Sequence, residues 1–306
     1  MPAALSKLRL KQMLAFAAKQ PPAKARAFVR ALCPLCCGEQ KTPPLAAQHF
    51  EKRQHAITAM QSAIRRHLDY AKHETLRKIE KAFRNGDIKA PLKSADAHGV
   101  AWDLIFDREE FGDGLLASLR EESATALHTA GNQLYAELGR DDPWTLPDPK
   151  AKAFLDARAN KLKGVSDEIH KAIQAEVKAG LDKGESLAKI SKRISDKFDD
   201  ISEGRAATIA STETSAAYGF ARQEGMTSAG IKYKRWLTSH LPNVRDTHAE
   251  AEEDEANQRV PIDEPFSVGG EDLMYPGDEN GSPENVINCH CVSLAVEDDE
   301  EEGDEL

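Results

Sequence analysis

The sequence predicts a mainly α-helical protein, with long helices in the N-terminal part followed by a small α+β domain near the C-terminus. Two observations carry this expectation. Apolar residues recur at steps of three, four or seven, as on one face of a helix, and the longest such stretch, 45–84, contains no Gly or Pro. From residue 230 the spacing changes to alternation around Trp236, and turn residues become frequent, which indicates strands joined by loops.

The N-terminal region divides into short helices and one long helix. Residues 5–19 and 23–32 have helical spacing, and prolines and cysteines follow them. Residues 45–84 carry one apolar stripe and are followed by Asn85-Gly86, a common helix stop. At about 1.5 Å per residue this helix would be roughly 60 Å long. Such a length favours a coiled-coil-like or partner-facing arm.

The remaining elements follow from the same spacing rules. Further helices are expected from Arg108 or Glu109 to Leu138, with an interruption near Gly112–Gly114, and then over 151–162, 166–179, 186–198 and 204–228. Strands are expected over 232–238, 258–268 and 291–296. The tail from Glu297 is acidic and should be disordered. We therefore divide the chain into a basic helical region (1–145), a helical connector (146–199), an α+β domain (200–296) and an acidic tail (297–306).

Charge is distributed unevenly along the chain. Residues 1–89 hold 18 Lys and Arg against 6 Asp and Glu, although the whole chain has a net charge of −10. Such asymmetry suggests that the two ends meet different partners, and a solvated basic helix face is the simpler alternative. The candidates for contact with DNA or with an acidic surface of a partner protein are Arg65, Arg66, Lys78 and Lys81. Other basic residues of the long helix are expected to stay in water: Lys52, Arg53, Lys72, Arg77 and Arg84. Its histidines are expected to face water or a partner: His49, His55, His67 and His73.

Composition argues against several classes of protein. Charged residues make up 30% of the sequence, and no apolar run is long enough for a membrane span or a signal peptide, so we expect synthesis in the cytoplasm. Five cysteines, an odd number in a chain of 306 residues, do not form a disulfide framework. The sequence has no Gly-rich phosphate loop, which argues against an ATPase, and no Ser or Cys motif for an activated nucleophile.

Cysteine and histidine residues form two candidate metal sites. His248, Cys289 and Cys291 offer zinc ligands, but alternate residues of a strand point to opposite faces unless the chain bends. Buried thiols that pack as small apolar groups are the alternative. Cys33 and Cys36 form a lone C-x-x-C, half of a zinc site. We therefore expect no cofactor, with a structural zinc at the first cluster as the open alternative.

The motifs of the last third occur in a recognisable order. A helix motif R-A-x-x-I-A-x-T-E starts at Arg205, and a strand with Trp236 at its centre follows. An R-x-x-H segment at 245–248, P-G-D at 276–278 and N-C-x-C at 288–291 complete the pattern. This order resembles the phage head morphogenesis domain, the family of phage Mu F-type minor head proteins.

The resemblance implies a minor capsid protein of a tailed bacteriophage, made in the host cytoplasm and present in the virion at the capsid interior or portal vertex. It implies association with the portal protein and with major capsid or scaffold proteins, action in head assembly, and a role beside packaged double-stranded DNA or in its ejection. It also implies a non-enzymatic role for a set of structural motif residues: Arg205, Thr212, Glu213, Trp236, Arg245 and Asn288. Two alternatives stay open. One is a metal-dependent nuclease or toxin-like enzyme that uses Glu213 and His248, and the other is a nonspecific DNA-binding module built on residues 1–89.

Overall fold

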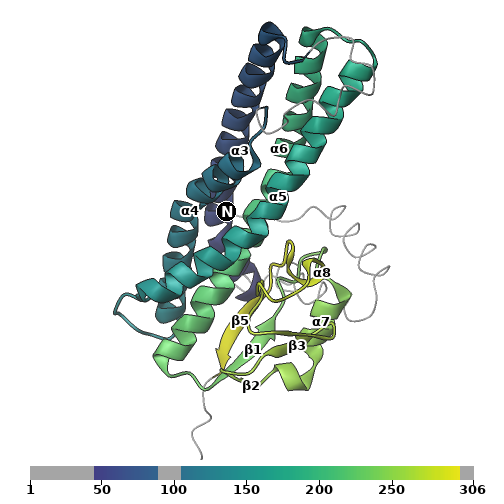
Figure 1. Cartoon of the computed structure of the whole chain (residues 1–306). Helices are drawn as coiled ribbons and strands as arrows, with labels where there is room; N and C mark the ends of the chain where they lie inside the picture. Colours follow the sequence, from purple (N-terminus) through teal and green to yellow (C-terminus); the bar gives the residue numbers. More distant parts are fainter. Residues whose placement is uncertain (1–44, 89–104, 297–306) are drawn as a thin grey trace, which may run out of the picture. The chain divides into compact units, whose positions relative to one another are not determined.

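The computed structural model describes residues 45–88 and 105–296, in which long helices precede short strands (Figure 1). The long helices are α3 (Leu45–Asn85), α4 (Arg108–Glu137), α5 (Asp148–Asp182) and α6 (Leu187–Ala229). The elements that follow are β1 (Tyr233–Leu237), α7 (Asp246–Glu253), the 3₁₀ helix η3 (Glu255–Asn257), β2 (Val260–Pro261), β3 (Phe266–Val268), β4 (Glu271–Leu273), α8 (Pro283–Val286) and β5 (Val292–Val296). This arrangement confirms the mainly α class with a small α+β C-terminal region. The short helices expected before Cys33, the C-x-x-C motif and the acidic tail lie outside the described residues.

The predicted interruption of α4 is wrong. The helix runs unbroken through Gly112 and Gly114 because both glycines serve close packing between helices. A Cβ atom on Gly114 would lie 2.6 Å from Cε1 of His67, and a Cβ on Gly112 would lie 3.0 Å from Oγ of Ser166. The absence of a side chain at these positions therefore lets α3 and α5 approach α4.

Helices α5 and α6 are each one helix where the sequence predicted two. The predicted breaks fall at Gly164 in α5 and before Gly204 in α6, and both glycines have open space around their Cα atoms. A solvent-facing glycine inside a helix costs only about 1 kcal/mol relative to Ala, so the packing of the flanking turns carries the helix through it.

The described residues form two compact units, each assembled from several stretches of sequence. The helical unit contains the described residues between 57 and 124 and those of 147–210. The mixed unit contains residues 45–56, 125–146 and 211–296. Helices α3, α4 and α6 contribute residues to both units. None of the described helices combines the length and the apolar character needed to cross a membrane.

The core of the helical unit is formed by the apolar faces of its helices. The stripe predicted for the long N-terminal helix is buried here rather than offered to a partner, so the expectation of a partner-facing arm is wrong. Its members from α3 are Ile57, Met60, Ile64, Leu68, Ala71 and Ile79. They pack with Phe111, Leu115 and Leu119 of α4, Ile169, Ile173 and Val177 of α5, and Ile190, Ile194 and Phe198 of α6. Burial of apolar surface against the chain itself explains why a helix of this length is stable without a partner.

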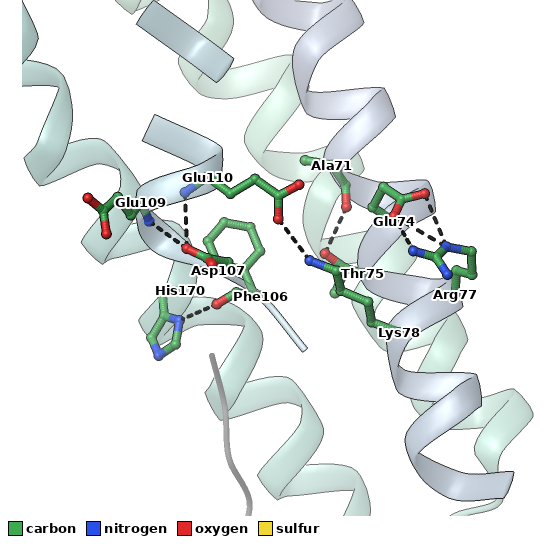
Figure 2. Close-up of polar contacts among 10 residues, drawn as sticks. All are labelled: Ala71, Glu74, Thr75, Arg77, Lys78, Phe106, Asp107, Glu109, Glu110 and His170. Carbon is green, nitrogen blue, oxygen red and sulfur yellow. Dashed lines mark hydrogen bonds and ion pairs between the residues drawn. The ribbon is translucent and has the colours of Figure 1, made fainter. Parts of the chain in front are cut away.

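Polar contacts fasten the start of α4 to its neighbours in the helical unit (Figure 2). The Asp107 carboxylate caps the helix by accepting a hydrogen bond from the backbone N–H of Glu110 at 3.0 Å. The Glu110 carboxylate in turn pairs with Nζ of Lys78 on α3 at 3.0 Å. On the other side, Nδ1 of His170 on α5 donates to the carbonyl of Phe106 at 3.2 Å.

The mixed unit contains a three-stranded antiparallel sheet with the order β2-β1-β5. Trp236, in β1, pairs with Ser293 of β5 and is fully buried. Strands β3 and β4 form a separate hairpin whose turn, Gly269-Gly270, has φ angles of +60° and +81°. Two consecutive positive φ angles are costly for any residue with a side chain, so this turn requires glycine.

The strand predicted over 258–268 is wrong, because the segment forms two strands, β2 and β3, that belong to different sheets. A turn separates them, closed by a hydrogen bond from the N–H of Glu264 to the carbonyl of Pro261 at 3.0 Å. The apolar residues at the two ends suggested one strand, but the charged residues and Pro265 between them mark the turn.

The P-G-D motif forms a turn that sits directly on α6. A Cβ on Gly219 would lie 2.2 Å from the carbonyl oxygen of Pro276, so only glycine permits this approach. Gly277 has a φ of +85°. The Asp278 side chain is buried and accepts a hydrogen bond from the backbone N–H of Met274 at 2.8 Å. The motif is therefore a structural turn.

Candidate functional site

One histidine and two cysteines lie together in the mixed unit, and all three are buried. His248 comes from α7, whereas Cys289 and Cys291 come from the segment between α8 and β5. Nδ1 of His248 is 3.4 Å from Sγ of Cys291 and 3.8 Å from Sγ of Cys289. The three potential ligand atoms lie within 4.8 Å of one another. The structure thus brings together the three residues that the sequence offered as metal ligands, here called the His–Cys–Cys cluster.

Both cysteines reach the same histidine because the chain is not a regular strand where they occur. Strand β5 begins only at Val292. Asn288, directly before the first cysteine, has a φ of +54°, in the left-handed region that Asn tolerates better than most residues. Because both cysteines precede the regular strand, the alternation of a strand does not separate the two thiols.

The two thiols differ in acidity. A hydrogen bond from Cys291, together with the neighbouring His248, holds the pKa of Cys289 well below its ordinary value. Burial raises the pKa of Cys291 well above its ordinary value. Cys289 is therefore the first thiol of the pair to ionise, and the thiolate is the form that binds metals.

Aromatic rings enclose the histidine of the cluster. The ring of Trp236 packs edge to face with His248 at a centroid distance of 5.5 Å and with Phe266 at 5.3 Å. His248 is 1% exposed, and Trp236 is fully buried. The central Trp of the motif thus fixes the orientation of the imidazole.

Arg53 of α3 holds the segment that carries the two cysteines. Its guanidinium donates hydrogen bonds to the carbonyl of Cys291 at 3.1 Å and to the carbonyl of His290. Phe50, one turn earlier, packs edge to face against the His290 ring at 5.2 Å. The expectation that Arg53 stays in water is wrong, because its side chain is only 2% exposed. The irregular segment presents two carbonyl oxygens, and a guanidinium can donate to both.

Several motif residues contact the segment before β5 or the cluster itself. Oγ1 of Thr212 on α6 accepts a hydrogen bond from the backbone N–H of Asn288 at 3.1 Å. Arg245, at the start of α7, donates to the carbonyl of Ile287. Together with Trp236, which packs on the histidine, these residues fix the conformation of the loop that carries the cysteines.

The other two motif residues have different surroundings. Glu213 follows Thr212 on α6 and is buried. Arg205 belongs to the helical unit, where its guanidinium pairs with the carboxylate of Glu168 on α5. Arg205 and Thr212 are seven residues apart on one helix, yet they fall in different compact units.

A buried ion pair that the sequence did not reveal lies elsewhere in the mixed unit. Arg222 of α6 is 2% exposed, pairs with Glu137 of α4 at 2.8 Å and donates to the carbonyl of Ser293 in β5 at 2.9 Å. His49 lies 3.7 Å from Glu137, and burial, together with the charge of Arg222, lowers its pKa to about 3. The expectation that His49 faces water is wrong, and the same holds for the buried His67. These partners lie far apart in sequence, so no local pattern could have identified them.

The basic candidates on α3 fall into two groups. Arg65, Arg66 and Lys81 are exposed. Lys78 is paired with Glu110, as described above, and Lys72 is paired with Asp199 at 2.9 Å. Acidic residues of the same unit therefore neutralise part of the positive charge of α3, and the expectation that Lys72 is solvated needs correction.

Comparisons with known proteins point to one family. The family model described as "Phage Mu protein F like protein" matches residues 171–294, which include α6, strands β1 and β2, the first three residues of β5 and the His–Cys–Cys cluster. The "Uncharacterized protein YqbB" of Bacillus subtilis (strain 168) is 30% identical over 136 residues, covering 42% of this chain and 42% of that protein. Comparison with solved structures gives no match.

The family match contains the motifs from Arg205 to Cys291, and in the structure most of these residues fix loops and buried contacts. Proteins of this family are generally structural components of phage heads or of their assembly. Residues 171–294 of this chain are therefore similar to the phage Mu protein F-like family, which supports the resemblance to phage head morphogenesis proteins seen in the sequence.

Proposed function

We propose that this chain is a minor capsid protein of a tailed bacteriophage that associates with the portal or the capsid interior and acts in head assembly. The observation that carries this proposal is the family match over 171–294, which spans the ordered motifs from Arg205 to Cys291. Synthesis in the host cytoplasm, incorporation into the virion beside major capsid or scaffold proteins, and participation in DNA ejection belong to the same proposal.

The surroundings of the motif residues support a non-enzymatic role. In the nuclease alternative, Glu213 and His248 would act as catalytic groups. His248 is 1% exposed and lies between Trp236 and the two cysteines, and Glu213 is 7% exposed. A general base has to come within hydrogen-bond reach of the proton that it abstracts, and buried side chains offer a nucleic acid no such approach.

The exposed basic residues of α3 are our candidate contact surface for the portal or for DNA. They are Arg65, Arg66 and Lys81, whereas the apolar stripe of the same helix is buried in the helical unit. Contact through this surface would therefore depend on charge and should weaken with salt. An acidic wall of a portal protein would suit such a surface. In the DNA-binding alternative the same residues would contact phosphates, and the affinity would fall more steeply with salt.

Co-expression with the portal protein of the same phage tests the proposal. We expect the full chain to co-purify with the portal, and a mass measurement of the complex would give the number of bound copies. Reversing two charges of the surface, in the double variant Arg65→Glu with Arg66→Glu, should lower the amount of captured portal by about tenfold or more. The matched control reverses two exposed lysines of α5, Lys171→Glu with Lys178→Glu, and should capture as much portal as the unchanged chain.

Three results decide between the alternatives. Failure of the unchanged chain to capture portal, or to appear in purified heads, would overturn the proposed role. Equal loss in the two double variants would overturn the proposed surface. The DNA-binding module would be favoured if the unchanged chain bound duplex DNA but captured no portal, and if the α3 double variant lost the DNA binding.

A further inference from the structure

We infer that the His–Cys–Cys cluster is a zinc site that joins α7 to the segment before β5. Its ligands are Nδ1 of His248 and the sulfur atoms of Cys289 and Cys291. This inference does not rest on the proposed capsid role, because it uses only the geometry and chemistry of the three side chains.

The distances within the cluster match those of a tetrahedral zinc site. With bonds of about 2.3 Å to sulfur and about 2.05 Å to nitrogen, tetrahedral angles place nitrogen and sulfur ligands about 3.6 Å apart and two sulfur ligands about 3.8 Å apart. Nδ1 of His248 lies 3.4 Å and 3.8 Å from the two sulfur atoms, on either side of the expected value. The two sulfur atoms lie within 4.8 Å of each other, so a zinc ion could be accommodated with displacements of no more than about 1 Å.

The kind of ligand also selects the cation. Two thiolates and an imidazole are soft or borderline donors, which favour zinc over magnesium or calcium. Nε2 of His248 is buried and has no hydrogen-bond partner within residues 45–88 and 105–296. Metal-ligating histidines usually donate a hydrogen bond from their other ring nitrogen, so the case for zinc rests on Nδ1 and the two sulfur atoms and not on Nε2. Two thiolates also balance the charge of one zinc ion.

The three ligand residues line a small pocket. Besides the cluster itself and His290, the pocket is lined by Ser239, Asn243, Val244, Arg245 and Asn288. It has room for about one water molecule. Zinc would thus have three protein ligands and room for one water, and the burial of all three ligands and the small size of the pocket favour a structural role over catalysis. The site is therefore structural.

The consequence for the fold is a cross-link between distant parts of the sequence. The cation would tie His248 of α7 to a loop that starts some forty residues later, as the sequence separations of 43 and 41 residues indicate. The same loop is held on its backbone side by Arg53. Binding to the folded chain alone would stabilise the mixed unit, and removal of the cation should lower its melting temperature.

The test needs a parent variant without competing thiols. Cys33, Cys36 and Cys37 lie outside the described residues and would confuse a zinc measurement, so all three are changed to Ser in the full-length chain. After expression with added zinc and purification under reducing conditions, elemental analysis of this parent should give about one zinc per chain. Replacement of zinc by Co²⁺ should produce the sulfur-to-cobalt charge-transfer absorption of a thiolate-bound ion.

Single changes in the parent then identify the ligands. Cys289→Ala should reduce bound zinc at least about tenfold and abolish the charge-transfer band, and His248→Gln should weaken zinc binding by a similar factor. Ser239→Ala, which changes the same pocket without removing a ligand, should keep the full equivalent. Circular dichroism shows whether each variant is folded.

The inference is overturned if the parent binds less than about a tenth of an equivalent of zinc, a measurement that requires no cluster variant to fold. It is also overturned if Cys289→Ala keeps the metal, or if zinc bound by the natural chain is lost entirely in the parent. In the latter case the metal belongs to the N-terminal cysteines. Oxidation of Cys289 and Cys291 to a disulfide in the freshly reduced, zinc-supplemented parent would likewise refute it.

Discussion

Replacement of Arg53 by Met tests whether the buried guanidinium holds the segment that carries the cysteines. Met keeps much of the length of the side chain but cannot donate hydrogen bonds. The variant therefore removes two interactions of one side chain, those to the carbonyls of His290 and Cys291, and leaves the apolar contacts of its stem largely in place.

The expected magnitude follows from those two contacts. A hydrogen bond from a charged donor contributes about 1.5–3 kcal/mol, so the two together contribute about 3–6 kcal/mol. Part of this is offset, because burial of the guanidinium is itself unfavourable and lowers the pKa of Arg53. We expect a net loss of about 2–4 kcal/mol in the free energy of unfolding. For a domain of this size that corresponds to roughly 5–15 °C in melting temperature.

Urea unfolding and thermal unfolding of the full chain measure the effect, with Trp fluorescence reporting on the mixed unit through the buried Trp236. Arg66→Met is the matched control, since it makes the same replacement at an exposed position of the same helix and should change stability by less than about 0.5 kcal/mol. Arg53→Lys should recover only part of the lost stability, because a single ammonium group cannot donate to two carbonyls with the geometry of a planar guanidinium. Equal effects of Arg53→Met and Arg66→Met would refute the reasoning.

Two further predictions concern pH and packing. Burial lowers the pKa of His49 to about 3, so between pH 6.5 and 3 the unfolded chain binds more protons than the folded chain. The free energy of unfolding therefore decreases as the pH is lowered, by about 2 kcal/mol at pH 5 relative to neutral pH. In His49→Gln, urea unfolding at pH 7 and pH 5 should show a smaller difference in the free energy of unfolding than in the unchanged chain. An equal difference would contradict the attribution of this pH dependence to His49. Gly131→Ala would place a methyl group 2.0 Å from Cε3 of Trp144 and should destabilise by about 3 kcal/mol or more. Gly204→Ala, with open space around it, should stabilise α6 by about 0.5–1 kcal/mol. The melting temperature should therefore fall in Gly131→Ala and rise in Gly204→Ala, and shifts in the same direction would contradict the described packing of Gly131 on Trp144.

Periodic features of the sequence predicted the structure well. The helix expected over 45–84 is confirmed as α3, with its end one residue later at Asn85 and a left-handed Gly86 after it. The strand around Trp236 is confirmed as β1, and the strand over 291–296 as β5. In α3 the buried residues recur with the helical period, so the spacing of apolar residues carries the signal, whereas β5 is buried on both faces at its start.

Features that depend on tertiary contacts were predicted poorly. Gly112 and Gly114 suggested a break in α4, although they allow other helices to approach. Arg53 was expected in water with the other basic residues of the long helix, whereas its partner Cys291 lies 238 residues away. The two cysteines were expected to point in opposite directions, as on a strand, but both of them precede β5, which begins at Val292. Propensity and spacing describe one element at a time, and such contacts belong to pairs of elements.

The composition of the mixed unit has a consequence for how the gene can evolve. The family match begins at residue 171, yet the compact unit that contains the cluster also includes residues 45–56 and 125–146. A recombination event that exchanged only the matched stretch between two related genes would deliver a new loop around Cys289 and Cys291 without the Arg53 that binds its carbonyls. Viable hybrids should therefore either inherit the start of α3 together with the matched stretch, or arise between parents that both have an arginine at this position.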